Sequence, residues 1–142
     1  MGFNKEYNKE DPDSVIWKDR KRTFLGLPWS FTKYKLTGDR LYINKGFFTS
    51  TEDEVRLYRI LDVGLKRTLG QKFLGLGTIE VHSSDRTLKD FTIKNIKKSK
   101  QVKKALSDAV EEQREVKRVV NRETMLDHDM FENDNDNDDG NN

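Results

Sequence analysis

The chain has 142 residues, which is enough for one domain with one continuous core, and its 27 Lys and Arg nearly balance its 25 Asp and Glu. It contains no Cys, which excludes disulfides, thiolate metal sites and a Cys nucleophile. No stretch approaches the ~18 apolar residues that span a bilayer, and the N-terminus lacks the apolar run of a signal peptide, so a soluble cytoplasmic protein is expected.

Charge divides the chain into three predicted segments. Residues 1–14 carry two Lys and four acids and are expected to form a polar, flexible N-terminus. Residues 15–122 carry 25 Lys and Arg against 13 acids and are expected to fold as the domain. Residues 123–142 carry eight acids and no Lys or Arg, and their composition predicts an acidic disordered tail. A basic body of this kind attracts anionic partners such as membrane surfaces, acidic proteins or nucleic acid.

Residues 30–93 predict an antiparallel sheet, because short runs alternate apolar and polar residues and are separated by turn residues. The first two runs, 30–37 and 40–44, flank Gly38 and Asp39 and predict a tight hairpin. Four further runs centre on Val55 and Leu57, on Val63 and Leu65, on Ile79 and Val81, and on Phe91 and Ile93. Six strands at this spacing indicate a sandwich or barrel.

The apolar spacing changes after Ser99. It becomes four and three alternately through Val102, Leu106, Ala109, Gln113, Val116 and Val120, with Gln113 the one polar member. This pattern predicts an amphipathic helix of about twenty residues, with Ser99 as N-cap and a narrow apolar stripe that covers the mouth of the barrel. The predicted fold class is therefore mainly β with one C-terminal α-helix.

Five stretches of the chain carry a resemblance to a known family. They are WKDRKR (17–22), GLPWSFTKY (26–34), YRILDV (58–63), LGQKFLGLGTI (69–79) and NI (95–96). Together, over roughly residues 15–118, they resemble the small bacterial pleckstrin-homology (PH) proteins of Gram-positive bacteria and their phages. The resemblance implies a PH-like β-sandwich or barrel capped by an amphipathic helix, with no established enzymatic activity. Phosphoinositide-binding members of the wider superfamily carry several Lys and Arg in their first hairpin loop, whereas the loop 37–40 has only Arg40, so no specific inositol phosphate site is expected.

The strongest candidate binding segment is residues 17–29, where cations lie among aromatic and apolar residues. Its members are Trp17, Lys18, Arg20, Lys21 and Arg22, followed by Phe24, Leu25, Leu27 and Trp29. Such a segment suits an anionic bilayer surface, where each cation contributes about 1 kcal/mol and aromatic rings enter the headgroup level. The competing interpretation is that the apolar residues pack against the sandwich and the cations are merely solvated.

Two weaker candidates are also cationic. Lys66, Arg67 and Lys72 flank a glycine-containing loop, 69–77, whose exposed amides and cations suit an anion; a turn that permits close backbone packing is the alternative. Six Lys between residues 94 and 104 surround the predicted helix start, either attracting an anion or forming a solvated edge.

The sequence predicts no catalytic site, no metal site and no cofactor. The only histidines are His82 and His128, and although His82 precedes Ser83 and Asp85, sequence neighbours on a strand point to opposite faces. The acidic run 134–140 ends before the Glu that closes a calcium loop. No small-molecule substrate is expected.

These observations predict a non-enzymatic binding module. The first hypothesis is protein–protein interaction or self-assembly, as a homo-oligomer, through the sandwich edge and the helix. The alternative is peripheral binding to anionic membrane, at its inner face, through the basic and aromatic segment 17–29. Nucleic acid is disfavoured because the basic helix also carries Glu111, Glu112 and Glu115 and no recognition signature is present. The acidic tail either folds back over an anion-binding face or only maintains solubility.

Overall fold

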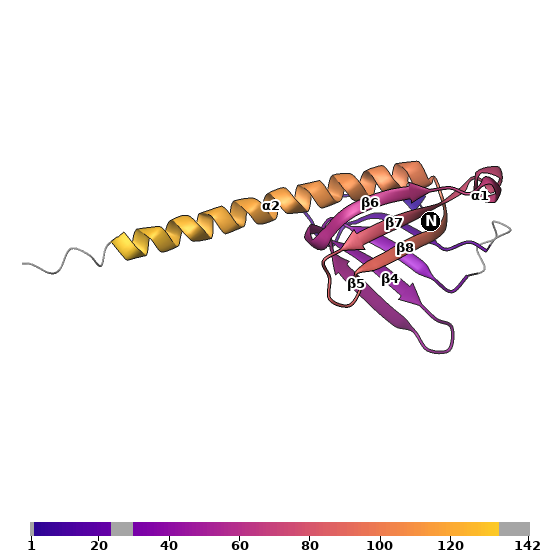
Figure 1. The fold of residues 1–142 in the computed structure, drawn as a ribbon, viewed down its shortest axis with the longest axis horizontal. Coiled ribbons are helices and arrows are strands. Elements are labelled where there is room, and N and C mark those ends of the chain that lie inside the picture. Colours follow the sequence, from indigo (N-terminus) through magenta and orange to yellow (C-terminus); the bar gives the residue numbers. More distant parts are fainter. Residues whose placement is uncertain (1, 24–29, 134–142) are drawn as a thin grey trace, which may run out of the picture.

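The computed structural model describes residues 2–23 and 30–133, and it shows two antiparallel sheets with one long C-terminal helix (Figure 1). The first sheet contains β1 (Gly2–Phe3), β2 (Val15–Arg20), β3 (Lys33–Thr37), β4 (Arg40–Lys45) and β5 (Thr51–Arg56), in that order. A 3₁₀ turn (Leu57–Arg59) leads to the second sheet of β6 (Ile60–Lys66), β7 (Leu76–Ser83) and β8 (Asp90–Lys97). The helices are α1 (Leu69–Leu74) and α2 (Ser99–Asn133). The predicted fold class, mainly β with one C-terminal helix, is confirmed.

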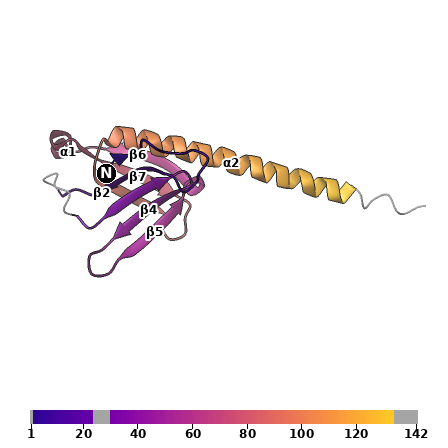
Figure 2. The same cartoon turned by 180° about the vertical axis from the view of Figure 1, so that it is seen from behind.

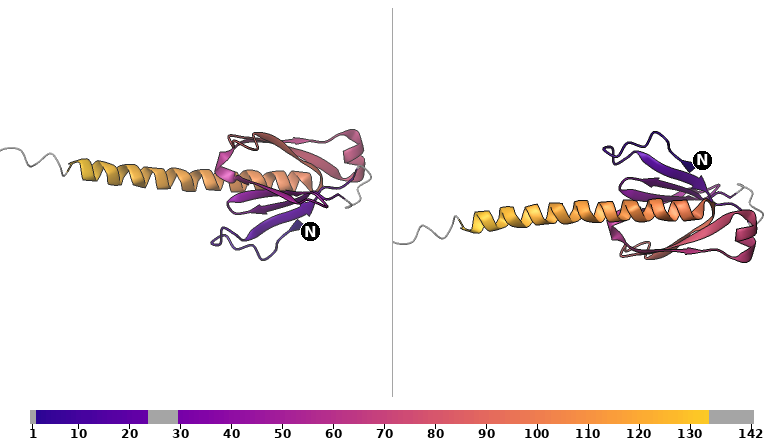
Figure 3. Two further views of the ribbon diagram at one scale, coloured as in Figure 1. Left: turned by 90° about the horizontal axis from the view of Figure 1, so that it is seen from below. Right: turned by 90° about the horizontal axis from the view of Figure 1, so that it is seen from above.

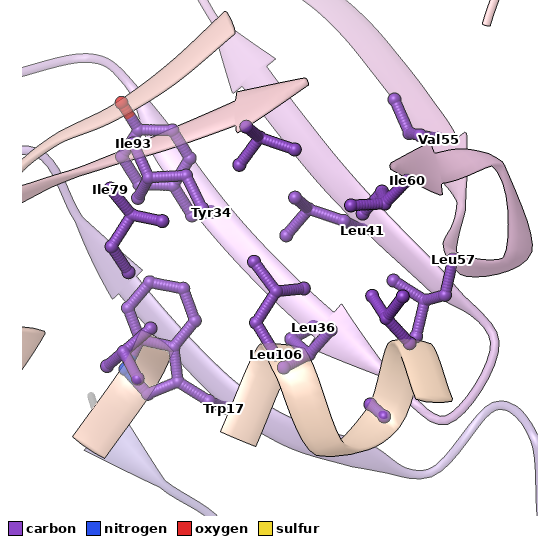
Figure 4. Close-up of a cluster of buried hydrophobic side chains, with 14 of the residues drawn as sticks. Trp17, Tyr34, Leu36, Leu41, Val55, Leu57, Ile60, Ile79, Ile93 and Leu106 are labelled. Atoms are coloured by element: carbon purple, nitrogen blue, oxygen red, sulfur yellow. The ribbon is translucent and has the colours of Figure 1, made fainter. Parts of the chain in front are cut away.

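The core lies between the sheets and under the first turns of α2. Strand alternation places Tyr34 and Leu36 of β3 inward, and the same rule buries Ile79 and Val81 of β7. Figure 4 shows Leu106, which α2 contributes, among side chains from both sheets. The predicted inward faces of these strands and the predicted covering role of the helix therefore hold.

The sequence interpretation missed one core strand, β2. Its inward positions are Trp17 and Asp19, and because one of these is charged the segment lacks the apolar alternation of a half-buried strand. Since β2 pairs with β3, an antiparallel pair connected through residues 21–32 precedes the β3–β4 hairpin that contains the tight turn 37–40. The turn 37–40 is therefore not the first connection between antiparallel strands in this fold.

Residues 2–14, for which a flexible segment was expected, contain a strand and several fixed turns. Phe3 of β1 pairs with Trp17, and the amide of Asn4 donates to the carbonyl of Ile16 at 2.9 Å. Lys9 forms an ion pair with Glu112 of α2 at 3.0 Å. The segment thus adds an edge to the first sheet and contacts the helix.

The predicted glycine loop at 69–77 contains the short helix α1. Thr68 and Gln71 form a reciprocal capping box at its start, and Gly75 ends it in the left-handed conformation at φ 72°. Gly77 lies so close to Ser99 that a Cβ at this position would overlap the Ser99 side chain. Close backbone packing, the alternative interpretation of these glycines, is therefore what the structure shows at Gly77.

Helix α2 has 35 residues, many more than expected. It continues through residues 123–133, which were expected to belong to a disordered tail, because this stretch includes the helix-favouring residues Met125 and Leu126. Its first turns cover the core, and the remainder extends away from the sandwich (Figures 1 and 3). Residues 134–142 of the predicted tail lie outside the described residues.

Candidate functional site

The outer face of the first sheet carries a cationic groove between β2, β3 and β4. Because Trp17, Tyr34 and Ile43 point inward, their neighbours along each strand point outward. The groove encloses about 290 Å³ and is lined by Lys18, Asp19, Arg20, Lys33, Tyr34, Lys35, Tyr42, Asn44 and Glu52. We call Lys18, Arg20, Lys33 and Lys35 the four groove cations.

The groove cations face one another as like-charged pairs. In the register of β2 and β3, Lys18 lies directly opposite Lys35, and Arg20 lies directly opposite Lys33. Like charges directly opposite on neighbouring strands destabilise a sheet. Among the residues that the structure describes, no carboxylate forms an ion pair with any of the four. An anion from outside the chain would relieve their mutual repulsion.

Two details of the groove support anion binding. The Nε of Arg20 is buried and lacks a hydrogen-bond partner, so a polar donor is left unsatisfied at this position. The ammonium of Lys35 lies 4.3 Å from the centre of the Tyr42 ring, which holds this cation on the sheet surface. Glu52 lines the opposite side of the groove, where its carboxylate repels anions. An anion is therefore favoured only on the β2–β3 side.

An exposed aromatic cluster lies at the end of the same sheet, where Phe31, which precedes β3, contacts the turn of the β4–β5 hairpin. Phe31 and Phe47 have ring centroids 4.6 Å apart, and Phe47 and Phe48 have centroids 4.7 Å apart. Their exposed fractions are 54%, 64% and 96% respectively, so the cluster places much apolar area in water. We call these three residues the aromatic tip.

The β4–β5 hairpin has a tight turn, which carries Phe47 and Phe48 of the aromatic tip. Gly46 has φ 112°, and a Cβ there would overlap the backbone of Thr49, so the tight turn requires glycine. The Ser50 hydroxyl donates to the Asn44 side chain at 2.9 Å and closes the base of the loop. The hairpin projects away from α2 in both views of the cartoon (Figures 1 and 2).

The groove and the aromatic tip form one continuous surface. A second hollow, lined by Arg20, Phe31, Lys33, Asn44, Gly46, Phe47 and Ser50, connects them. Arg20 and Lys33 therefore belong to both hollows, with aromatic rings on one side and the other groove cations on the opposite side.

The structure separates the residues of the first predicted site. Trp17 is 1% exposed and belongs to the core, so it is not available to a ligand. Arg22 is also buried, and its Nη1 donates to the Asp19 carboxylate at 2.8 Å. Lys18 is exposed, and Arg20 and Lys21 are half-buried. Phe24, Leu25, Leu27 and Trp29 lie outside the described residues.

The second predicted cluster lies beside α1. Lys66 and Lys72 are exposed, whereas the Nε of Arg67 donates to the Leu76 carbonyl at 3.0 Å. Leu69 and Phe73 of α1 are 85% and 91% exposed, so this end of the molecule also presents apolar side chains next to cations. In Figure 1, α1 lies at the same end of the sandwich as the β4–β5 turn.

His82 forms a surface pair with Asp90. Its Nδ1 lies 2.9 Å from the Asp90 carboxylate, and this hydrogen bond raises the pKa of His82 above its usual value of 6.5. Both side chains are exposed on the second sheet, and no hydroxyl of the described residues is hydrogen-bonded to the imidazole as a nucleophile would be. In the described ranges, no cluster of three potential metal ligands is found, and no helix there is long and apolar enough to cross a membrane.

Sequence reasoning missed the aromatic tip and half of the groove. Two adjacent phenylalanines after Gly46 in a polar turn were the available signal for the tip. Lys33 and Lys35 alternate with Tyr34 and Leu36 in the predicted strand 30–37, but only the cross-strand register brings these lysines opposite Arg20 and Lys18.

Comparison with known proteins agrees with this architecture. Residues 23–110, more than half of the chain, match the family model described as Bacterial PH domain. No curated protein and no solved structure matches the chain. The matched range begins at residue 23, between β2 and β3, and ends at Val110, which is the last buried residue among the described side chains of α2. With its two antiparallel sheets and its C-terminal helix, the chain belongs to the bacterial PH domain family.

Proposed function

We propose that the chain is a peripheral membrane-binding module that docks on an anionic lipid surface through the groove cations and the aromatic tip. The observation that carries the proposal is the continuity of these two features on one face, through Arg20 and Lys33. The family itself indicates a binding module, and the proposal includes no covalent chemistry.

The groove supplies the electrostatic part of the binding. Cations near an anionic lipid surface contribute about 1 kcal/mol each, so four of them contribute about 4 kcal/mol at low salt. A lipid phosphate between the facing pairs relieves the repulsion between Lys18 and Lys35 and offers an acceptor to Arg20.

The aromatic tip supplies the apolar part. Phe47 and Phe48 are exposed in the free protein, and transferring them to the headgroup boundary removes apolar area from water. Full burial of a Phe side chain contributes about 1.5–3 kcal/mol, of which an interfacial ring gains a part. Stable attachment to a membrane takes two such signals, and this face has both.

Co-sedimentation with vesicles tests the proposal. The full chain is expected to bind vesicles of phosphatidylserine and phosphatidylcholine and to leave vesicles of phosphatidylcholine alone without bound protein. Binding is expected to weaken as salt is raised, because exposed charges are screened. Equal binding to both kinds of vesicle, or to neither, contradicts the proposal.

Matched variants localise the binding. Lys33→Gln/Lys35→Gln is expected to lower the partition coefficient by about tenfold or more, because two near-surface cations are lost. The control Arg86→Gln/Lys89→Gln removes the same charge from the β7–β8 turn, at the other end of the sandwich, and is expected to bind almost as the parent does.

The aromatic part has its own pair of variants. Phe47→Ser/Phe48→Ser is expected to lose binding that lower salt does not restore, whereas Leu61→Ser, which removes another exposed apolar side chain, is expected to retain it. If the two phenylalanines are dispensable, the aromatic tip has no part in docking.

A further inference from the structure

Helix α1 presents two large apolar side chains to solvent. Leu69 and Phe73 are 85% and 91% exposed. They are four positions apart in the helix and therefore lie on the same side of it. Large apolar side chains that are grouped on a surface mark a contact with a protein or a membrane. We call these two residues the α1 ridge.

The opposite side of α1 is attached to the sandwich. At about 100° per residue, Gln71 lies on the side of the helix that faces away from the ridge. Its side-chain amide donates to the Thr78 hydroxyl at 2.8 Å and to the Asn95 side chain at 2.7 Å. These bonds connect α1 to β7 and β8, and the capping box fixes the start of the helix. The ridge therefore cannot turn inward to join the core unless these bonds break.

The surface around the α1 ridge is cationic. Lys66 and Lys72 are exposed beside the helix. Strand β7 begins two residues after α1, and its pairing with β8 brings Lys97 and the start of α2 to the same place. A hollow there is lined by Arg67, Gly75, Lys98, Ser99, Lys100 and Gln101. Residues 66–79 and 91–107 contain no Asp or Glu, and among the described residues no carboxylate forms an ion pair with any of the Lys and Arg just named. This charge favours an anionic partner.

The α1 ridge and the aromatic tip lie at the same end of the sandwich (Figures 1 and 2). The ridge belongs to the connection between β6 and β7 of the second sheet, whereas the tip belongs to the first sheet. Apolar side chains that come from separate sheets at one end are contacted together by a flat, extended partner. Both features also have cations beside them, since Arg20 and Lys33 line the hollow next to the tip. An anionic bilayer has the charge and the flat apolar boundary that suit this end of the molecule.

We propose that α1 is a second membrane-contacting element, and that the α1 ridge and the aromatic tip enter the same anionic bilayer. The inference rests on the proposed docking function and adds to it a contact from the second sheet and an orientation of the domain. Helix α2 runs from this end of the sandwich to the other end and beyond it (Figure 1). A domain that stands on this end therefore holds the outer part of α2 away from the lipid.

Substitution of the ridge tests the contact by vesicle co-sedimentation of the full chain. On vesicles of phosphatidylserine and phosphatidylcholine, Leu69→Ser/Phe73→Ser is expected to lower the partition coefficient about tenfold, because two apolar side chains no longer leave water on binding. The matched control Val116→Ser/Val120→Ser removes an exposed apolar pair of the same spacing from α2 and is expected to bind as the parent does. Urea unfolding checks that both variants keep the fold, which is expected because all four side chains are more than half exposed.

The absence of Cys from the chain allows a fluorophore to be attached at one chosen site at a time. A Cβ at Gly70, beside the ridge, meets no atom within 4 Å, so Gly70→Cys has room for a label. This label is expected to be quenched by nitroxide-bearing lipid in the anionic vesicles. Labels on Arg86→Cys, in the β7–β8 turn at the other end of the sandwich, and on Glu123→Cys, in the outer part of α2, are expected to remain unquenched.

The outcomes separate this inference from the docking function. If the tip variant loses binding while the ridge variant binds as the parent does and the Gly70 label is unquenched, the inference is overturned and the docking function stands. If the ridge variant loses binding and the Gly70 label is quenched, while the groove and tip variants bind as the parent does, the inference stands and docking through the groove and tip is refuted. A chain that binds no anionic vesicle refutes both.

Two further results would overturn the inference. A dimer in analytical ultracentrifugation that Leu69→Ser/Phe73→Ser dissociates, together with an unquenched Gly70 label, would show that a second copy covers the ridge. Quenching of the Glu123 label as strong as that of the Gly70 label would show that the domain lies flat on the bilayer with α2 against the lipid.

Discussion

Replacing Arg22 by Met removes one partner of an ion pair that lies inside the sandwich. The Arg22 Nη1 donates to the Asp19 Oδ2 at 2.8 Å, and the two side chains are only 11% and 5% exposed. The other carboxylate oxygen of Asp19 accepts from the Arg20 amide at 2.7 Å. After Arg22→Met, this backbone amide is the remaining donor to a buried carboxylate.

The expected cost follows from leaving that charge uncompensated. Breaking a buried pair by removing one partner destabilises proteins by about 3–5 kcal/mol, and because both side chains retain slight contact with solvent we expect the lower end, about 3 kcal/mol. Replacing both residues, as in Asp19→Leu/Arg22→Met, removes the stranded charge and is expected to cost about 1 kcal/mol or less.

Urea unfolding followed by tryptophan fluorescence measures this difference, since Trp17 is buried in the core and is exposed on unfolding. A loss below about 1 kcal/mol for Arg22→Met, accompanied by weaker vesicle binding, would refute the reasoning. That result would mean that Arg22 acts as a surface cation, as the sequence interpretation proposed.

Three further predictions concern other parts of the chain. Nuclear magnetic resonance titration is expected to place the pKa of His82 above 6.5, and Asp90→Asn is expected to lower it. Because the pKa of His82 is higher in the folded state than in the unfolded state, the His82–Asp90 pair stabilises the fold below pH 6.5, and this contribution is lost as pH rises through the folded-state pKa. A stability difference between the parent and Asp90→Asn that does not depend on pH would contradict this. Leu106→Ala is expected to cost about 2–5 kcal/mol in urea unfolding, whereas Leu126→Ala is expected to cost far less in dilute solution; equal losses would disprove the division of α2 into covered and uncovered halves. Gly77→Ala is expected to lower the thermal unfolding midpoint, because the added methyl group meets a side chain at the start of α2; an unchanged midpoint would show that the strand adjusts freely.

The alternating strands and the covering helix could be predicted because their pattern is local. Tyr34 and Leu36 alternate with lysines, and Leu106 belongs to a set of apolar residues at helical spacing. The inward face of each element can therefore be predicted from its own sequence. Strand β2 could not be recognised in this way, since Asp19 occupies an inward position that only its partner Arg22 makes acceptable.

The candidate site depends on information that no single segment contains. Arg20 and Lys33 become neighbours only through the register of β2 and β3, which cannot be deduced from the residues between the two strands. The extent of α2 was underestimated for a different reason: acidic composition in 123–133 suggested disorder, while Met125 and Leu126 continue a helix that had already begun.

Because α2 is one continuous helix, the helical structure of its outer half depends on the folding of the domain. A free helix of fewer than about 12–15 residues is marginal in water because nucleation is unfavourable, but elongation from an existing helix adds one hydrogen bond for each residue fixed. The turns around Leu106 are held by the core, so the stretch beyond Lys117 grows from a nucleus that the folded domain provides. A partner that recognises this stretch therefore binds only while the sandwich is folded. If the sandwich loses its packed core or is cleaved, the helical recognition surface is lost as well.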